Sequence, residues 1–260
     1  MSFIEINNIW KEYGSHVILE RLNIRVEKGE FITIVGASGC GKTTFLKLLL
    51  GTETVTRGEL TLEGKKILDE PSEERGIVFQ KYSVFPHLNV LENVLIGVEF
   101  KQSKYLSRLF GKNKLGAQKE AEEILTAVGL GHAMTKYPHE LSGGMQQRLA
   151  LAQALIKKPK ILLLDEPFGA LDPGIRQDMH ALVLNLWREH QLTVFMITHD
   201  LKEGFYLGTR LWVFDKSRHD EHSPESYGAT ITFDLPVTRC SEDDFSEIET
   251  SMKKTKSLPA

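Results

Sequence analysis

The stretch Gly36-Ala37-Ser38-Gly39-Cys40-Gly41-Lys42-Thr43 matches the pattern G-x-x-x-x-G-K-[ST]. The apolar run at residues 31–35 predicts a buried strand before it, and the apolar run that follows predicts a helix ended by Gly51. Glycines allow successive backbone N–H groups to converge on phosphate oxygens, and the helix adds the positive end of its dipole. A strand, a glycine-rich loop and a helix in this order therefore predict a site for the phosphates of a nucleotide.

Two side chains of this stretch have the chemistry that such a site needs. Lys42 can reach the β- and γ-phosphates, and the Thr43 hydroxyl can ligate Mg²⁺. The positive helix end would also lower the pKa of the Cys40 thiol, unless this cysteine only fills space. The residues expected to bind nucleotide here are Gly36, Ala37, Ser38, Gly39, Cys40, Gly41, Lys42, Thr43 and Thr44.

A second stretch, Ile161-Leu162-Leu163-Leu164-Asp165-Glu166, consists of four apolar residues followed by two acids. A buried strand would deliver Asp165 to the carboxyl edge of a parallel sheet, where ligand sites in α/β folds lie. We expect Asp165 to hold Mg²⁺ and Glu166 to polarise a water that attacks the γ-phosphate. This pattern is weak alone, and the phosphate-binding loop upstream makes it specific.

A third stretch, Leu141-Ser142-Gly143-Gly144-Met145-Gln146-Gln147-Arg148, predicts a second helix N-terminus suited to anions. Ser142 can cap a helix of residues 144–156, and Gly143 and Gly144 leave the helix end bare. A single active site hardly needs two separate phosphate-binding sites. The simplest explanation is a dimer in which the helix end of each chain closes the nucleotide of the other.

Length and charge restrict the class of protein. The chain has 260 residues, 32 Lys and Arg against 35 Asp and Glu, and a formal net charge of -3. This length allows one large domain or two modest ones. The near-neutral charge argues against a nucleic-acid partner, and no apolar run approaches the ~20 residues that cross a bilayer. The first residues lack a secretory signal and the two cysteines form no disulfide framework, so we expect a cytosolic chain.

The apolar spacing predicts an α/β body with a helical insertion. Strands are expected around residues 3–6, 22–26, 31–35, 59–62, 67–68, 160–165, 192–198 and 229–235. The spacing is helical from about residue 84 to residue 158 and again around residues 175–186. The basic stretch at residues 101–114 is either an amphipathic surface helix or a solvated loop. Residues 241–260 are expected to form a polar tail, in which Phe245, Ile248 and Met252 have the spacing of one short helical stripe.

The three stretches together resemble the motifs of ATP-binding-cassette (ABC) ATPases, because residues 141–148 lie between the other two stretches, as the signature of that family does. The resemblance covers about residues 2–239. It implies an α/β P-loop NTPase core with an N-terminal antiparallel β subdomain and a helical subdomain at about 84–158. The whole would be a single ATPase domain at residues 1–240 that binds ATP with Mg²⁺.

The resemblance also assigns roles to residues whose types alone decide little. Gln80 resembles the glutamine that reaches Mg²⁺ and the attacking water, and His199 resembles the switch histidine that contacts the γ-phosphate and orients Glu166. Asp172 resembles a residue that communicates across the dimer. Tyr13 matches the aromatic that stacks on adenine, although it could be strand packing, and Trp10 is the lesser candidate.

Three classes share this core: transporter subunits, DNA-repair or chromosome-structure ATPases, and translation-type cassettes. The gap between the phosphate-binding loop and residues 141–148 is too short for the long coiled coil of DNA-repair ATPases, and each motif occurs once, unlike in translation-type cassettes. Both observations favour a transporter subunit with a separate integral-membrane permease. Met145 and the residues 165–172 look most like the bacterial nitrate, sulfonate and taurine importer group, whereas residues 85–87 look like polyamine importers. The resemblance implies a second ATPase copy, itself or a homologue, a solute-binding protein, and a place on the cytoplasmic face of the inner membrane.

Overall fold

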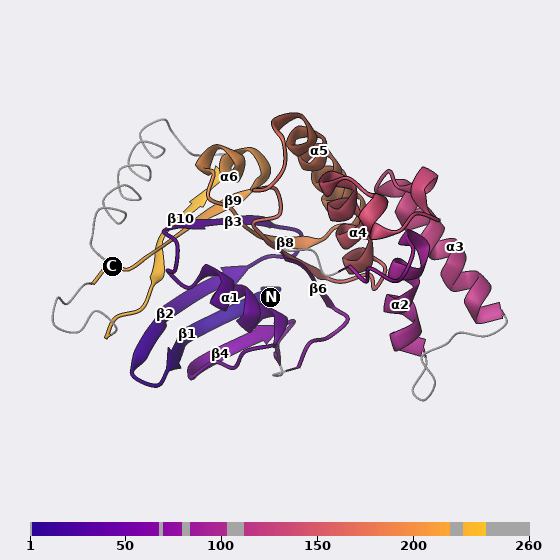
Figure 1. The fold of residues 1–260 in the computed structure, drawn as a ribbon. Coiled ribbons are helices and arrows are strands. Elements are labelled where there is room, and N and C mark those ends of the chain that lie inside the picture. The colour runs from indigo at the N-terminus through magenta and orange to yellow at the C-terminus, as the bar shows by residue number, and fades with distance from the viewer. Residues whose placement is uncertain (1, 68–69, 80–83, 103–111, 219–225, 238–260) are drawn as a thin grey trace.

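The computed structural model describes residues 2–67, 70–79, 84–102, 112–218 and 226–237 (Figure 1). Its first sheet is antiparallel, with the strand order β2 (His16–Val26), β1 (Ile4–Tyr13), β4 (Arg57–Leu62) and β5 (Lys65–Lys66). Its second sheet has the order β10 (Thr230–Pro236), β9 (Arg210–Asp215), β3 (Phe31–Gly36), β8 (Thr193–Ile197), β7 (Ile161–Asp165) and β6 (Arg75–Val78). The second sheet is parallel except for β10, which runs antiparallel to β9.

Helix α1 (Lys42–Leu50) lies between the two sheets (Figure 1). Its Phe45 packs edge-on against Phe195 and Trp212, at ring-centroid distances of 6.2 and 6.0 Å. Both aromatic partners are fully buried. Because α1 packs on strands of the parallel sheet at this point, the loop before it is fixed at the carboxyl edge of that sheet.

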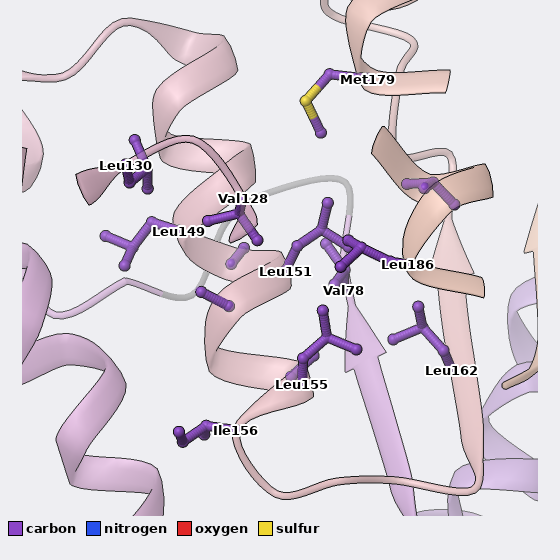
Figure 2. Close-up of a cluster of buried hydrophobic side chains, with 14 of the residues drawn as sticks. Val78, Val128, Leu130, Leu149, Leu151, Leu155, Ile156, Leu162, Met179 and Leu186 are labelled. Atoms are coloured by element: carbon purple, nitrogen blue, oxygen red, sulfur yellow. The ribbon is translucent and has the colours of Figure 1, made fainter. Parts of the chain in front are cut away.

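The remaining helices cover the other side of the parallel sheet and its β6 end. They are α2 (Val90–Gln102), α3 (Lys112–Ala127), α4 (Gly143–Leu155), α5 (Pro173–His190) and α6 (Leu201–Leu207). Figure 2 shows the core that joins them, where Leu151 and Leu155 of α4 meet Leu162 of β7 and Leu186 of α5. Two short 3₁₀ turns at Gly131–Ala133 and Pro138–Glu140 connect α3 to α4.

The fold class is confirmed, and so are most of the expected elements. One expected strand is displaced: β5 covers residues 65–66 rather than 67–68, because the turn at Glu63 and Gly64 brings Lys65 and Lys66 opposite β4. Part of the basic stretch and the tail helix lie outside the described residues. Across the residues described, no helix combines the length and the apolar character that a bilayer span requires.

Candidate active site

The phosphate-binding loop connects β3 to α1, as predicted. Gly41 has a φ of 91°, and a Cβ atom there would lie 2.8 Å from Cδ2 of Leu19, so only glycine fits. Gly41 is also the residue that caps α1, and it has no side chain to occupy the first N–H groups of the helix. The positive end of α1 is therefore open toward the loop.

Lys42 is buried and its ammonium group lies inside the loop. Nζ donates hydrogen bonds to the carbonyl oxygens of Gly36 at 2.9 Å and Ala37 at 2.7 Å. These two bonds hold the lysine at the mouth of the loop, where an anion would compete with the carbonyls for its protons.

The expectation for Cys40 is wrong. Burial raises the pKa of its thiol, and the neighbouring Lys42 lowers that pKa by a smaller amount. The side chain is 5% exposed, and Sγ donates to the carbonyl of Phe214 at 3.6 Å. Desolvation outweighs the positive helix end, and the thiol acts as a small buried filler, which was the alternative interpretation.

The two predicted magnesium ligands that the structure describes lie together. Thr43 donates from Oγ1 to Oδ1 of Asp165 at 3.4 Å across the gap between α1 and β7. Burial raises the pKa of Asp165, and the adjacent Glu166 adds to that rise, while the Thr43 hydrogen bond lowers it. A hydroxyl and a carboxylate that lacks full solvation form a hard oxygen donor set, which fits Mg²⁺. Gln80, the third predicted ligand, lies outside the described residues.

Glu166 and His199 are brought into direct contact, although 32 positions separate them in the sequence. Oε1 of Glu166 meets Nε2 of His199 just beyond the carboxyl ends of the neighbouring parallel strands β7 and β8. Glu166 has a left-handed backbone with a φ of 48°, and its N–H donates to the carbonyl of Ile197 at 3.1 Å. A side chain with this strained backbone at a strand end is typical of functional sites.

The predicted cap of α4 is confirmed. Oγ of Ser142 accepts a hydrogen bond from the N–H of Met145 at 3.4 Å. Gly144 is buried, and a Cβ atom there would lie 2.6 Å from Cγ2 of Ile175 on α5. The fully buried Gln147 donates from Nε2 to the carbonyl of Pro167, the residue after Glu166. The N-terminal half of α4 is thereby attached to the segment that carries Glu166.

Tyr13 and Asp172 are both exposed at positions where a ligand or partner could reach them. Tyr13 ends β1 and is 44% exposed, with Nζ of Lys11 at 4.5 Å from its ring centroid. Partial burial and a hydrogen bond to Glu53 raise the pKa of Tyr13 to about 12. Asp172 occupies the N-cap position of α5 without a side-chain hydrogen bond to the helix. Trp10 instead lies against Arg57, with the guanidinium at 4.9 Å from the ring.

Sequence reasoning missed a buried polar network beside His199. Glu203 on α6 contacts both Thr198 and His180, and all three side chains are buried. An acid in the first turn of a helix is ordinarily explained by the helix dipole, so the sequence carried no signal for this network.

Comparison with known proteins identifies the family. The family model for ABC transporters matches residues 19–169. The bicarbonate transport ATP-binding protein CmpD of Synechocystis sp. is 40% identical over 84% of this chain and 76% of its own length. The aliphatic sulfonates import ATP-binding protein SsuB of Bacillus anthracis is 39% identical over 84% of both chains. The chain spans 62% of the sulfate/thiosulfate import ATP-binding protein CysA of Rhodopseudomonas palustris, at 41% identity.

Solved structures of ABC transporter cassettes have the same fold. A dimeric bacterial ABC transporter cassette, MJ0796, superposes with a TM-score of 0.71 at 30% identity, over 90% of this chain and 98% of its own. The cassette MJ1267, solved with ADP, superposes with a TM-score of 0.77 at 24% identity and supports the fold alone. The order of motifs, the fold and both comparisons agree: the chain belongs to the ABC transporter family and is an ATP-binding cassette with the ATPase motifs of that family.

Proposed function

We propose that this chain powers the import of a small polar or anionic solute, as a dimer that closes on two ATP molecules and drives a separate permease. The observation that carries the proposal is the pairing of Glu166 with His199 directly beside the pairing of Thr43 with Asp165. Both pairs lie at the carboxyl edge of the parallel sheet, next to the open end of α1.

In this proposal the ATP phosphates lie on the loop at residues 36–44, and Tyr13 stacks on the adenine. The backbone N–H groups of the loop and the ammonium of Lys42 neutralise the phosphate charges. Thr43, Asp165 and Gln80 would hold Mg²⁺. When bound, the ion would neutralise charge that develops on the phosphate oxygens.

Glu166 would accept a proton from the water that attacks the γ-phosphate, and His199 would hold Glu166 in place while contacting that phosphate. Their direct contact supports this division of roles, since a base needs an oriented side chain. Gln80 would help to position the attacking water.

The second subunit would complete each site. Ser142, Gly143 and Gly144 would present the open end of α4 to the nucleotide bound by the other chain, and Asp172 would contact the opposite subunit. The solved dimer of the related cassette MJ0796 supports two-chain assembly. Closure by γ-phosphate contacts, followed by opening after hydrolysis, is a recognised switch mechanism.

The test is Glu166→Gln in the full-length chain. This variant keeps the size of the side chain and removes the base, so ATP binding is retained while turnover falls by about 10²-fold or more. With ATP it should accumulate as a dimer on size-exclusion chromatography. The Glu189→Gln variant, in the last turn of α5, is the matched control and keeps wild-type turnover. Undiminished hydrolysis by Glu166→Gln would contradict the proposed catalytic role.

A groove between β6, α2 and α4 supports a permease partner. Its cavity measures about 440 Å³, and the partly exposed rings of Phe79 and Phe85 are among the side chains that line it. Asn93, fully buried, donates from Nδ2 to the carbonyls of Phe85 at 3.0 Å and Leu88 at 2.8 Å, which fixes the loop beside the groove. We propose that a permease helix docks here, on the cytoplasmic face of the inner membrane. A chain that purifies without any membrane partner would favour a non-transport ABC ATPase instead.

The solute is proposed from relatives. SsuB and CmpD are named for sulfonates and bicarbonate, and NrtD of Synechocystis sp., 39% identical, is named for nitrate. A small oxyanion is therefore the favoured solute class, delivered by a solute-binding protein. The spermidine/putrescine import protein PotA of Roseobacter denitrificans, 42% identical over 81% of this chain, supports a polyamine or other organic solute as the second candidate. Mass spectrometry of what the co-purified solute-binding protein retains would decide between them.

A further inference from the structure

We infer that Glu203 is a positioning residue for the ATPase reaction, because its buried contacts with Thr198 and His180 complete a closed ring that passes through the Glu166–His199 pair. This inference rests on the proposed roles of Glu166 and His199. The ring runs from Glu166 along the chain to Phe168, through His180 and Glu203 to Thr198, and along the chain to His199.

The first half of the ring holds the residue before His199. The Oγ1 hydroxyl of Thr198 donates a hydrogen bond to Oε2 of Glu203. Oγ1 of Thr198 also accepts a hydrogen bond from the N–H of Asp200 at 3.1 Å. His199 therefore lies between two residues that one hydroxyl fixes. The carboxylate of Asp200 accepts the N–H groups of Lys202 at 2.9 Å and Glu203 at 3.3 Å, which ties the same segment to the first turn of α6.

The second half of the ring holds the segment after Glu166. Oε1 of Glu203 bonds to Nε2 of His180 on α5 at 2.7 Å. The His180 ring meets the ring of Phe168 at a centroid distance of 4.9 Å in an edge-on arrangement. Phe168 follows Glu166 by two residues and is 1% exposed, so its ring is a fixed reference point.

The buried polar members stiffen the side of the ring that lies away from the Glu166–His199 pair, whose side chains are 23% and 48% exposed. Thr198 is 3% exposed, Glu203 8% and His180 9%. A carboxylate removed from water needs hydrogen-bond donors, and removing one donor leaves a buried group unsatisfied. Both carboxylate oxygens of Glu203 have a hydrogen-bond partner within the ring, His180 for one and Thr198 for the other. Loss of either partner therefore weakens the hold of Glu203 on the other. His180 also belongs to α5, whose N-cap is Asp172, and this helix links the ring to the proposed subunit contact.

Thr198→Val tests the ring, since it removes the hydroxyl and keeps the shape. In the full-length chain the kcat for ATP falls by roughly 10- to 100-fold, because a displacement of ~1 Å in a catalytic group costs up to about 10²-fold. The KM for ATP changes by less than about twofold, since Thr198 lies outside the proposed ATP contacts. Thr198→Ser restores the hydroxyl and recovers most of kcat.

Thr33→Val is the matched control. Thr33 lies on the neighbouring strand β3, is fully buried and donates from Oγ1 to the carbonyl of Gly204 on α6 at 3.0 Å. The Thr33→Val variant therefore loses a comparable buried hydroxyl that takes no part in the ring of contacts through Glu203. The two valine variants should lose similar thermal stability, and only Thr198→Val should lose kcat. Equal kcat in both variants would overturn the inference.

A double-variant cycle adds a second readout. His180→Phe keeps a ring against Phe168 and removes the bond to Glu203. Because either change opens the same ring, the double variant with Thr198→Val should lose no more kcat than the worse single variant. If the kcat losses of the two single variants multiply in the double variant, the inference is overturned. Full activity of Glu166→Gln would instead refute the proposed function, so the two failures are distinguishable.

Discussion

Two opposing influences meet at the thiol of Cys40, which lies at the positive end of α1 and inside the core between the sheets. The helix end and Lys42 favour the thiolate, while loss of water disfavours it, and the second effect is larger. An exposed cysteine at the same place would be reactive. Burial therefore decides the chemistry of this residue.

The reactivity of Cys40 follows from its raised pKa. In a Cys240→Ser background, we expect alkylation at pH 8 to be ~10-fold or more slower than that of a free thiol, because both thiolate and access are reduced. ATP should add little further protection. Mass spectrometry of the alkylated peptide over time measures the rate, and rapid alkylation that ATP blocks would contradict the prediction.

The same shift gives a pH dependence of stability. The unfolded chain releases the thiol proton at a lower pH than the folded chain, so above the unfolded pKa of ~8.5 the unfolded state binds fewer protons and stability falls as pH rises. Below that pH the thiol is protonated in both states, so it does not change the dependence of the unfolding free energy on pH.

Tyr13 offers a test of adenine stacking that separates its ring from its hydroxyl. Stacking of a base on an aromatic ring contributes about 1–3 kcal/mol, so Tyr13→Ala should weaken ATP binding by roughly 5- to 150-fold, whereas Tyr13→Phe should keep most of the affinity. Trp10→Ala, on the same strand but held against Arg57, should leave affinity unchanged. Isothermal titration measures all three, and equal losses for Tyr13→Ala and Trp10→Ala would refute the assignment.

At the scale of elements, β1 and β4 depend on one glycine contact. Asn8 has a left-handed backbone with a φ of 48° and interrupts the regular pairing of the two strands. Gly58 lies against this irregularity, and a Cβ atom there would lie 2.2 Å from the carbonyl oxygen of Asn8. The close approach of two backbones therefore requires glycine at position 58.

Gly58→Ala should destabilise the protein by about 3 kcal/mol or more, because the left-handed backbone and the clash add together. Gly29→Ala is the matched control, since Gly29 has a φ of 83° and no atom within 4 Å of a Cβ. It should cost only ~1–2 kcal/mol. Denaturation with urea measures both, and equal destabilisation would contradict the prediction.

Local patterns predicted many of the elements. The apolar runs around Phe31 and Ile161 gave buried parallel strands, and the Gly51 and Ser142 signals placed a helix end and a helix start correctly. The strand β9 was missed because its apolar residues form a continuous run without alternation. The helix α6 was missed although Asp200 caps it, because a helix of seven residues is too short to show a helical apolar spacing. The ring through Glu203 was missed for a different reason, since it forms only when α5, α6 and β8 pack together.

At the scale of the whole molecule, the proposed dimer gives each chain two separate half-sites. One is the loop before α1 and the other is the capped start of α4. In that dimer, a half-site defect carried by only one of the two chains affects only one of the two composite sites. Ser142→Asp would keep the cap, since aspartate caps as well as serine, but it would place a negative charge toward the phosphates.

Mixing two inactive variants tests this arrangement. Lys42→Ala and Ser142→Asp should each abolish most ATPase activity in a homodimer. In the mixed dimer both defects fall on one composite site, and the other site is intact, so activity should return. Steady-state phosphate release measures it, with each variant alone as the control. Mixtures that stay as inactive as either variant would show that the two half-sites are not shared between chains.

The strand order also has a consequence for the newly made protein. Strand β3, which carries the phosphate-binding loop, lies between β8 and β9, so that Phe31 pairs with Val194 and Ile32 with Arg210. At about 5–20 residues per second, the ribosome makes those partner strands roughly 10–30 s after the loop. Throughout that interval the loop has no sheet to hold it. The nascent chain should therefore acquire affinity for ATP only when its synthesis is nearly complete, and products truncated before β9 should neither bind nucleotide nor occupy a permease.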